Sequence, residues 1–159
     1  MFIDFKDLSE DSKVWIYPSN RKFYPQEIEE VQTKIQLFID DWNSNDANFK
    51  ASYQFLYNRF IIFSVDENSS IENKDIDTSV QFILELEKEY NVQLLDRMNV
   101  CFKQGEFVQY KDLKEFKKLI KSRAISKKTI VFDNLVTTKQ ELENYWEVPI
   151  TESWYNRFL

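Results

Sequence analysis

The stretch "KASYQFLYNRFIIFSV", residues 50–65, decides the fold. Its first half alternates apolar side chains with polar ones, which predicts a strand over residues 50–57 with one buried face. Its second half, residues 59–65, is continuously apolar and rich in β-branched and aromatic side chains, which predicts a central strand. The short link around Asn58 predicts a hairpin between the two.

Two amphipathic helices are predicted, one before and one after this hairpin in the sequence. Residues 25–43 begin with Pro25, which suits the first turn of a helix, and carry apolar side chains at helical spacing. Residues 77–90 follow a polar loop, and Thr78 with Gln81 matches a capping box. A short buried strand, residues 14–17, precedes the first helix.

The chain has a single glycine, Gly105, inside "VCFKQGEFVQY", residues 100–110. Strand-like segments lie on both sides of it. A tight turn between them needs a residue with positive φ, which glycine adopts without steric cost. We therefore expect a second hairpin here, followed by a helix over 111–123, a strand over 129–133, a short helix over 138–146 and an aromatic tail.

This order of elements predicts an α+β fold with a ferredoxin-like β-α-β-β-α-β start and a mainly antiparallel sheet. A β-α-β-α segment extends it, and residues 1–159 are expected to form a single domain because no linker interrupts them. We expect strands 14–17 and 59–65 to be parallel neighbours. The loops that follow them would then meet at one edge of the sheet.

The residues that are missing exclude several classes of enzyme. With one glycine, the chain cannot form a P-loop, a dinucleotide-binding fingerprint or a hydrolase nucleophile elbow. With no histidine, it cannot form a Ser-His-Asp triad or a His-containing zinc site. What these absences leave open is catalysis by carboxylate, Lys/Arg, Tyr or lone-Cys side chains, or no catalysis at all.

The charge of the chain is uneven. Its net charge of −6 argues against bulk nucleic-acid binding, yet residues 111–128 carry eight basic and two acidic side chains. Such a strip is typical of a solvated helix face, and it also suits an acidic partner, a phosphate ligand or self-association. A single cysteine, Cys101, no apolar run long enough for a membrane span and no signal peptide predict a cytoplasmic protein.

The two loops at the expected sheet edge carry the candidate ligand-binding residues. These are Ser19, Asn20, Arg21, Asp66, Glu67, Asp77 and Ser79. In one interpretation, Asp66, Glu67 and Asp77 hold a Mg²⁺. In that case Arg21 steadies a substrate phosphate.

Two other interpretations of these loops stay open. Ser19, Asn20, Arg21 and the helix N-termini can bind an anion without any chemistry and without a cofactor. Alternatively the residues are structural: Asp77 caps its helix and Arg21 pairs with Asp66 or Glu67.

The C-terminal tail is a second candidate region. Trp154, Tyr155 and Phe158 either dock on their own domain or contact a protein partner or a second copy of the chain. We expect no membrane contact. Asp96 and Arg97 predict a local ion pair.

Several segments carry a resemblance to a known family. They are "VWIYPSNRKF", "YNRFIIFSVDE", "DTSVQFILELEKEYNVQLLDRMNVCFKQGEF", "TIVFDNLVT" and "YWEVPITESWYNRF". Over nearly its whole length the chain resembles an uncharacterised family of Bacteroidetes proteins of similar size that is often labelled "ABC transporter ATPase". Residues 73–77 read Asn-Lys-Asp-Ile-Asp where that family leads us to expect Gly-Cys-Ser-Ile-Asp, which leaves Asp77 a better candidate than Asp75. The missing P-loop excludes the ATPase activity for this chain.

Taken together, these observations predict a cytoplasmic, non-enzymatic ligand-binding or protein-interaction module. The alternative is a Mg²⁺-dependent enzyme that acts on a phosphate-bearing substrate through its acidic loop.

Overall fold

The structure is a computed structural model that describes residues 1–96 and 98–159. It confirms the α+β class, because the described residues form four α-helices and two antiparallel sheets, in an order that begins β-α-β-β-α-β. The chain divides into two compact units, Met1–Leu95 and Asp96–Leu159, and each is described by itself. The single domain expected for residues 1–159 stays a prediction. The expected Asp96–Arg97 pair involves a residue outside the described ones.

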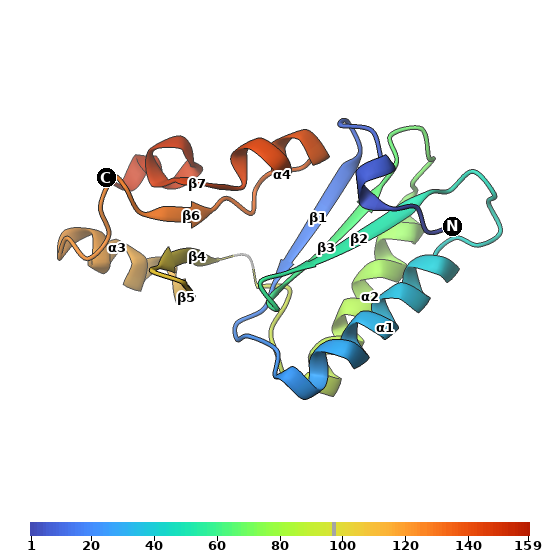
Figure 1. Cartoon of the computed structure of the whole chain (residues 1–159), viewed down its shortest axis with the longest axis horizontal. Helices are drawn as coiled ribbons and strands as arrows, with labels where there is room; N and C mark the ends of the chain where they lie inside the picture. The colour runs from blue at the N-terminus through green and yellow to red at the C-terminus, as the bar shows by residue number, and fades with distance from the viewer. Residues whose placement is uncertain (97) are drawn as a thin grey trace. The chain divides into compact units, whose positions relative to one another are not determined.

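The first unit contains a three-stranded sheet (Figure 1). Its strands are β1 (Lys13–Pro18), β2 (Ala51–Leu56) and β3 (Phe60–Val65), in the order β1-β3-β2, with β3 antiparallel to both neighbours. The expectation that the first and third strands are parallel is therefore wrong. The tight β2–β3 hairpin reverses the chain, while the helix between β1 and β2 returns it in the original direction, so β3 runs opposite to both.

The β2–β3 hairpin turns through two residues with positive φ, Tyr57 at 56° and Asn58 at 51°. The Arg59 N–H donates to the Leu56 carbonyl at 3.0 Å and closes the turn. Two consecutive residues of this conformation are characteristic of a type I′ turn, whose twist matches that of the strands. The predicted hairpin is confirmed.

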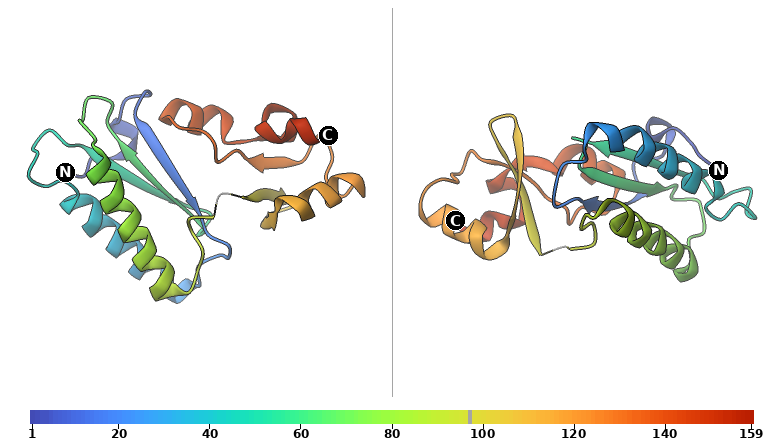
Figure 2. Two further views of the ribbon diagram at one scale, coloured as in Figure 1. Left: turned by 180° about the vertical axis from the view of Figure 1, so that it is seen from behind. Right: turned by 90° about the horizontal axis from the view of Figure 1, so that it is seen from below.

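Two helices, α1 (Pro25–Asp41) and α2 (Asn73–Tyr90), cover one face of this sheet (Figures 1 and 2). A short 3₁₀ helix, η1 (Phe5–Asp7), precedes β1. The core between helices and sheet contains fully buried side chains from every layer, among them Val31, Ile35, Ile39, Ile61, Phe63 and Ile83. The apolar side chains that recur at helical spacing along α1, such as Val31 and Ile35, thus help to build the core.

Helix α2 begins four residues before the predicted start. Its first turn is closed at Glu72, whose backbone N–H donates to the Asp75 carboxylate at 2.9 Å. Thr78 lies inside the helix, and its hydroxyl donates to the Lys74 carbonyl at 2.8 Å. The predicted capping box of Thr78 and Gln81 is therefore wrong, and Asp75 has the capping role.

The second unit has its own four-stranded sheet in the order β5-β4-β6-β7. Its strands are β4 (Asn99–Gln104), β5 (Phe107–Asp112), β6 (Ile130–Phe132) and β7 (Glu147–Pro149). Gly105 follows Gln104, which pairs with Phe107, and has a φ of +62°. A Cβ on Gly105 would meet nothing within 4 Å, so the backbone conformation is what requires glycine here.

Helices pack on this second sheet around a separate core. They are α3 (Leu113–Lys121), α4 (Lys139–Tyr145) and the 3₁₀ helices η2 (Ile150–Glu152) and η3 (Trp154–Phe158). The core cluster includes Phe102, Phe116, Val131, Ile150 and Tyr155. The ring of Phe116 lies 5.5 Å from that of Tyr155, so the C-terminal tail contributes to the core of this unit.

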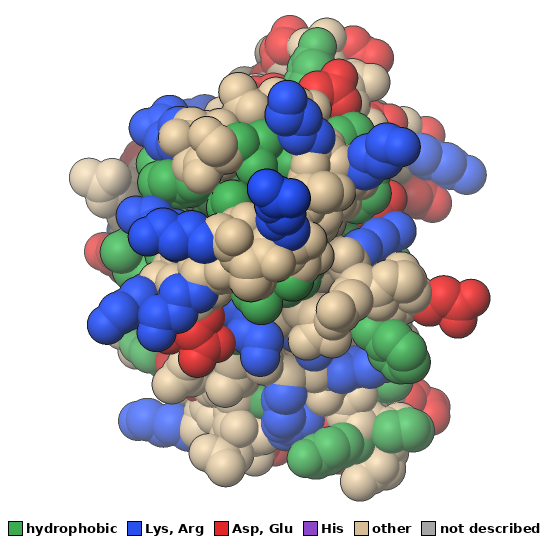
Figure 3. All heavy atoms as spheres, turned by 90° about the vertical axis from the view of Figure 1, so that its left-hand side faces the viewer, with side chains coloured by type: hydrophobic (Ala, Val, Ile, Leu, Met, Phe, Trp, Pro, Cys, Tyr) green, Lys and Arg blue, Asp and Glu red, His purple; other side chains and the backbone are tan. Residues whose placement is uncertain are grey.

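The two units differ in charge. Met1–Leu95 has 18 acidic and nine basic side chains, a net charge of −9, whereas Asp96–Leu159 has nine acidic and 12 basic ones, a net charge of +3. Figure 3 views the side of the molecule on which α3 lies in Figure 1, and Lys and Arg side chains are abundant on this face. The strip predicted from residues 111–128 accounts for eight of the 12 basic side chains.

Candidate functional site

The two loops predicted to share one site lie at opposite ends of the first sheet. In the β1–β3 register, Pro18 pairs with Phe60 and Lys13 pairs with Val65. Ser19 therefore follows one end of this strand pair and Asp66 follows the other. At about 3.3 Å per residue, the two ends of a six-residue strand are separated by about 17 Å. The expectation that these loops meet is wrong, because it rested on a parallel pairing.

The first predicted loop is fixed to its neighbours by hydrogen bonds. The Ser19 N–H donates to the Arg59 carbonyl at 3.0 Å, and Ser19 itself is fully buried. Asn20 bonds twice to Gln93: its N–H donates to the Gln93 carbonyl at 3.1 Å, and its side-chain oxygen accepts from the Gln93 N–H at 2.9 Å. The polar groups of this loop thus hold the end of β1 against the segment after α2.

Arg21 takes part in a hydrogen-bond network within the first unit. Its guanidinium donates to both carboxylate oxygens of Glu27, at 3.0 and 3.2 Å, and also to the Tyr90 backbone carbonyl at the end of α2. The guanidinium also stacks 4.2 Å from the centre of the Tyr24 ring. The hydrogen bond from Arg21 holds the pKa of Glu27 below its usual value. The predicted pairing of Arg21 with Asp66 or Glu67 is therefore wrong.

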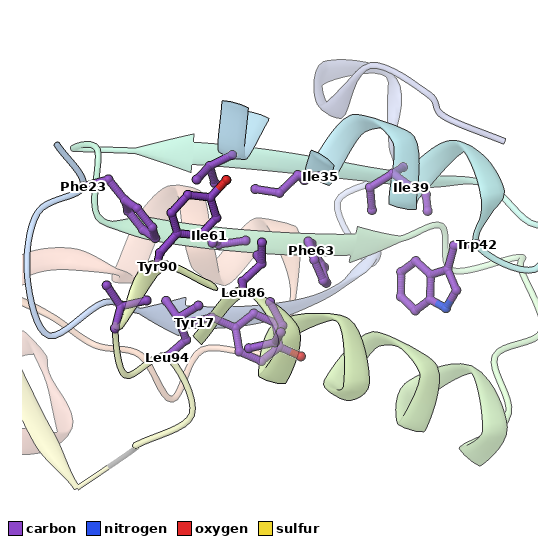
Figure 4. Packing of buried hydrophobic residues seen from close by; sticks show 14 of the residues in the cluster. Tyr17, Phe23, Ile35, Ile39, Trp42, Ile61, Phe63, Leu86, Tyr90 and Leu94 are labelled. Atoms are coloured by element: carbon purple, nitrogen blue, oxygen red, sulfur yellow. The ribbon is translucent and has the colours of Figure 1, made fainter. Parts of the chain in front are cut away.

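A second network joins α1 to α2 beside the first. The Tyr90 hydroxyl donates to Glu30 at 2.6 Å, and the Lys34 ammonium donates to both Glu30 and Glu89. Burial, together with the bond to Glu30, raises the pKa of Tyr90 to about 12. The phenol therefore stays protonated near neutral pH and acts as a hydrogen-bond donor. Figure 4 shows Tyr90 beside Phe23 at one end of the core.

The second predicted loop holds residues with local roles. The Asp66 carboxylate accepts from the Asn68 N–H at 3.2 Å, while Glu67 and Asp77 are exposed. Ser79 is buried, and its hydroxyl donates to the Ile76 carbonyl at 2.6 Å. In residues 1–96 and 98–159, no three acidic or cysteine side chains are grouped so that they could hold a metal ion.

Helix α3 carries the most concentrated charge of the second unit. Lys114, Lys117, Lys118 and Lys121 are spaced i, i+3, i+4 and i+7, so they lie on one side of the helix, and all four are exposed. We call these four residues the α3 lysine face. Phe116 on the opposite side is fully buried, which fixes the orientation of the helix. None of the four lysines forms an ion pair within the described part of the chain.

The aromatic tail borders the α3 lysine face. Lys117 lies 4.5 Å above the centre of the Phe158 ring, and Arg157 lies 4.1 Å above that of Trp154. Tyr155 is buried, and its burial raises the pKa of its hydroxyl. Of the three tail residues predicted to contact a partner, Tyr155 is thus used inside its own unit. Trp154, 36% exposed, and the half-buried Phe158 remain at the surface.

Most members of the two networks could not be identified from the sequence. Glu30 and Lys34 carry a signal, since they are spaced i, i+4 with the acidic residue first. Arg21 and Glu27 carry none, because one lies in a loop and the other in the first turn of a helix. No sequence spacing predicts a contact of Arg21 or Glu27 with Tyr90.

No helix among residues 1–96 and 98–159 has the length and apolar character needed to cross a membrane. Comparisons of the chain with protein-family models, with curated proteins and with solved structures give no match.

Proposed function

We propose that this protein is a non-enzymatic interaction module that binds an acidic protein segment through the α3 lysine face. The observation that carries the proposal is the row of four exposed lysines on one side of a helix whose other side is anchored in a core. Surface ammonium groups without an internal partner attract carboxylates, and a fixed helix presents them in a defined geometry.

Further basic side chains flank helix α3 in the sequence. Lys111 precedes the helix, and Arg123, Lys127 and Lys128 follow it, the last three exposed. None of these four side chains forms an ion pair with a described residue. Together with α3 they offer an acidic segment several points of contact. The surface aromatic rings Trp154 and Phe158 supply apolar contact area next to it.

An acidic protein suits this surface better than a nucleic acid does. The chain as a whole is negatively charged, and its first unit has a net charge of −9, which repels a dense polyanion. Stacking of bases needs an accessible ring face. One face of Trp154 is covered by Arg157, and its ring also contacts Tyr155 and Phe158.

The first experiment is a titration with a fluorescein-labelled, glutamate-rich peptide, followed by anisotropy. The test variant replaces Lys114, Lys118 and Lys121 with Gln and retains Lys117, which contacts Phe158. The matched control replaces three exposed lysines of the first unit, Lys13, Lys50 and Lys88, with Gln, and so changes the net charge equally.

We expect the test variant to bind the peptide about tenfold more weakly, since each exposed pair contributes up to about 1 kcal/mol. The control should change the affinity by less than about twofold, because screening limits the effect of remote charges. Equal losses in both variants would contradict the proposal. So would a single-stranded DNA that binds the α3 lysine face while the peptide does not.

We further propose a cytoplasmic location, supported by the single cysteine, which is buried at Cys101. Membership of the Bacteroidetes family that the sequence resembles is also a proposal. Two expectations stay predictions. One is a contact with a second copy of the chain through the tail, and the other is a Mg²⁺-dependent enzymatic activity.

A further inference from the structure

A groove of about 400 Å³ runs between the two helices of the first unit. Its lining includes Leu37, Phe38 and Asp41 on α1 and Phe82, Glu85 and Glu89 on α2, together with Lys34 and Leu86. Each helix presents its three residues within two turns, so the groove extends about 10 Å along the helices. It lies apart from the α3 lysine face in the chain and has the opposite charge.

The floor of the groove is aromatic. The rings of Phe38 and Phe82 stack with their centres 4.4 Å apart and their planes at 12°, and both pack on the core beneath. Leu37 stands beside them and is 60% exposed, a large value for an apolar side chain on a helix. An apolar floor with an exposed leucine at its edge gains stability when another apolar surface covers it.

The rims of the groove are acidic. Asp41 and Glu85 are exposed, and neither carboxylate has an ion-pair or hydrogen-bond partner through its side chain among the described residues. At the other end, Lys34 neutralises Glu89. Helices α1 and α2 together carry ten acidic and three basic side chains. The surroundings therefore favour a cationic occupant.

We propose that this groove binds a basic amphipathic helix from another protein. Apolar side chains on one face of that helix would cover Phe38, Phe82 and Leu37, and its Lys or Arg side chains would pair with Asp41 and Glu85. Two apolar rows on adjacent helices form a common docking surface for a third helix, whose anchors repeat at three and four residues. Charge selects a basic helix over a neutral or acidic one.

The probe is a synthetic Leu/Lys peptide about four helical turns long, with leucines on one face. Two control peptides are used. The first keeps the leucine pattern but has Glu in place of each Lys, and the second keeps the composition but has a scrambled sequence. The protein variants are Leu37→Ser and the double change Asp41→Lys with Glu85→Lys. Their matched control, Glu10→Lys with Glu67→Lys, reverses two exposed acids of the same unit outside the groove.

We expect saturable binding of the Leu/Lys peptide only, with amide resonances shifting at residues 34–41 and 82–89. The groove variants should each weaken binding about tenfold or more and the control by less than about twofold. Binding that the control weakens as much as the groove variants would overturn the proposal. So would equal binding of the scrambled peptide, or a second copy that occupies the groove, seen as a dimer in sedimentation that Leu37→Ser dissociates. The probe here is cationic and that for the α3 lysine face is anionic, so each proposal can fail without the other.

Discussion

Single residues with unusual backbone conformations fix both hairpins. Gly105 turns the β4–β5 hairpin with a φ of +62°, and the sequence made it conspicuous because no other glycine exists. Tyr57 and Asn58 make the equivalent turn in the first unit without glycine. The position of that turn could be read from the two apolar strands around it. The left-handed backbone conformation of Tyr57 could not be predicted, because residues with a bulky side chain rarely adopt a positive φ.

We predict that Gly105→Ala destabilises the fold by about 1 kcal/mol, because an alanine at positive φ is strained even where space is free. Urea unfolding of both proteins measures this difference. Glu106→Ala, at the next position of the same turn, is the control and should change stability by less than about 0.5 kcal/mol. An unchanged or increased stability of Gly105→Ala would show that the turn does not require this conformation.

Glu27 makes a pH-dependent contribution to stability. Its folded-state pKa is lowered by the bond from Arg21, so its contribution is present above the unfolded pKa and is lost as the pH falls through the folded value. We predict that Glu27→Gln lowers the free energy of unfolding by roughly 1 kcal/mol near neutral pH. The difference should shrink below a pH of about 4.5.

Thermal unfolding of wild type and Glu27→Gln across this pH range measures the effect. A stability difference that stays constant down to the lowest pH would contradict it, since the carboxylate would then contribute nothing through its charge.

At the scale of elements, hydrophobic periodicity predicts the four helices and the strands β1 to β6 in their order, but the three-residue strand β7 was not predicted. The direction of the strands was not predictable either. The β1–β3 pairing depends on which strands become neighbours, and local pattern carries no information on that. A parallel β1–β3 pair would bring Ser19–Arg21 beside Asp66 and Glu67, whereas the antiparallel pair in the structure separates them. The α3 lysine face, by contrast, follows from spacing along one helix and needs no knowledge of topology.

The start of α2 gives a test at this scale. We predict that Asp75→Ala lowers the free energy of unfolding by about 1 kcal/mol, because the Glu72 N–H loses its acceptor. Thr78→Ala should change it by less than about 0.5 kcal/mol, since alanine suits a helix interior. Chemical denaturation of the two variants compares them directly. The reverse ranking would place the helix start at Asp77, where the sequence alone suggested it.

At the scale of the whole molecule, the described residues of the chain form two sheets, and its two units have net charges of opposite sign. We predict that it nevertheless unfolds in one cooperative transition, because a unit as small as Asp96–Leu159 buries too little surface to be more than marginally stable alone. Differential scanning calorimetry tests this by comparing calorimetric and van't Hoff enthalpies. Two separate transitions would contradict the single domain predicted from the sequence.

We propose that the protein binds an acidic partner at the α3 lysine face, and the two predicted loops follow opposite ends of the β1–β3 pair and share no site. The most direct measurement is an amide chemical-shift map of the isotope-labelled protein titrated with the glutamate-rich peptide. We expect shifts concentrated in residues 111–128 and the neighbouring tail, and we expect them to disappear when Lys114, Lys118 and Lys121 are replaced with Gln. Shifts concentrated instead at residues 19–21 or 66–79, or no shifts at all, would contradict it.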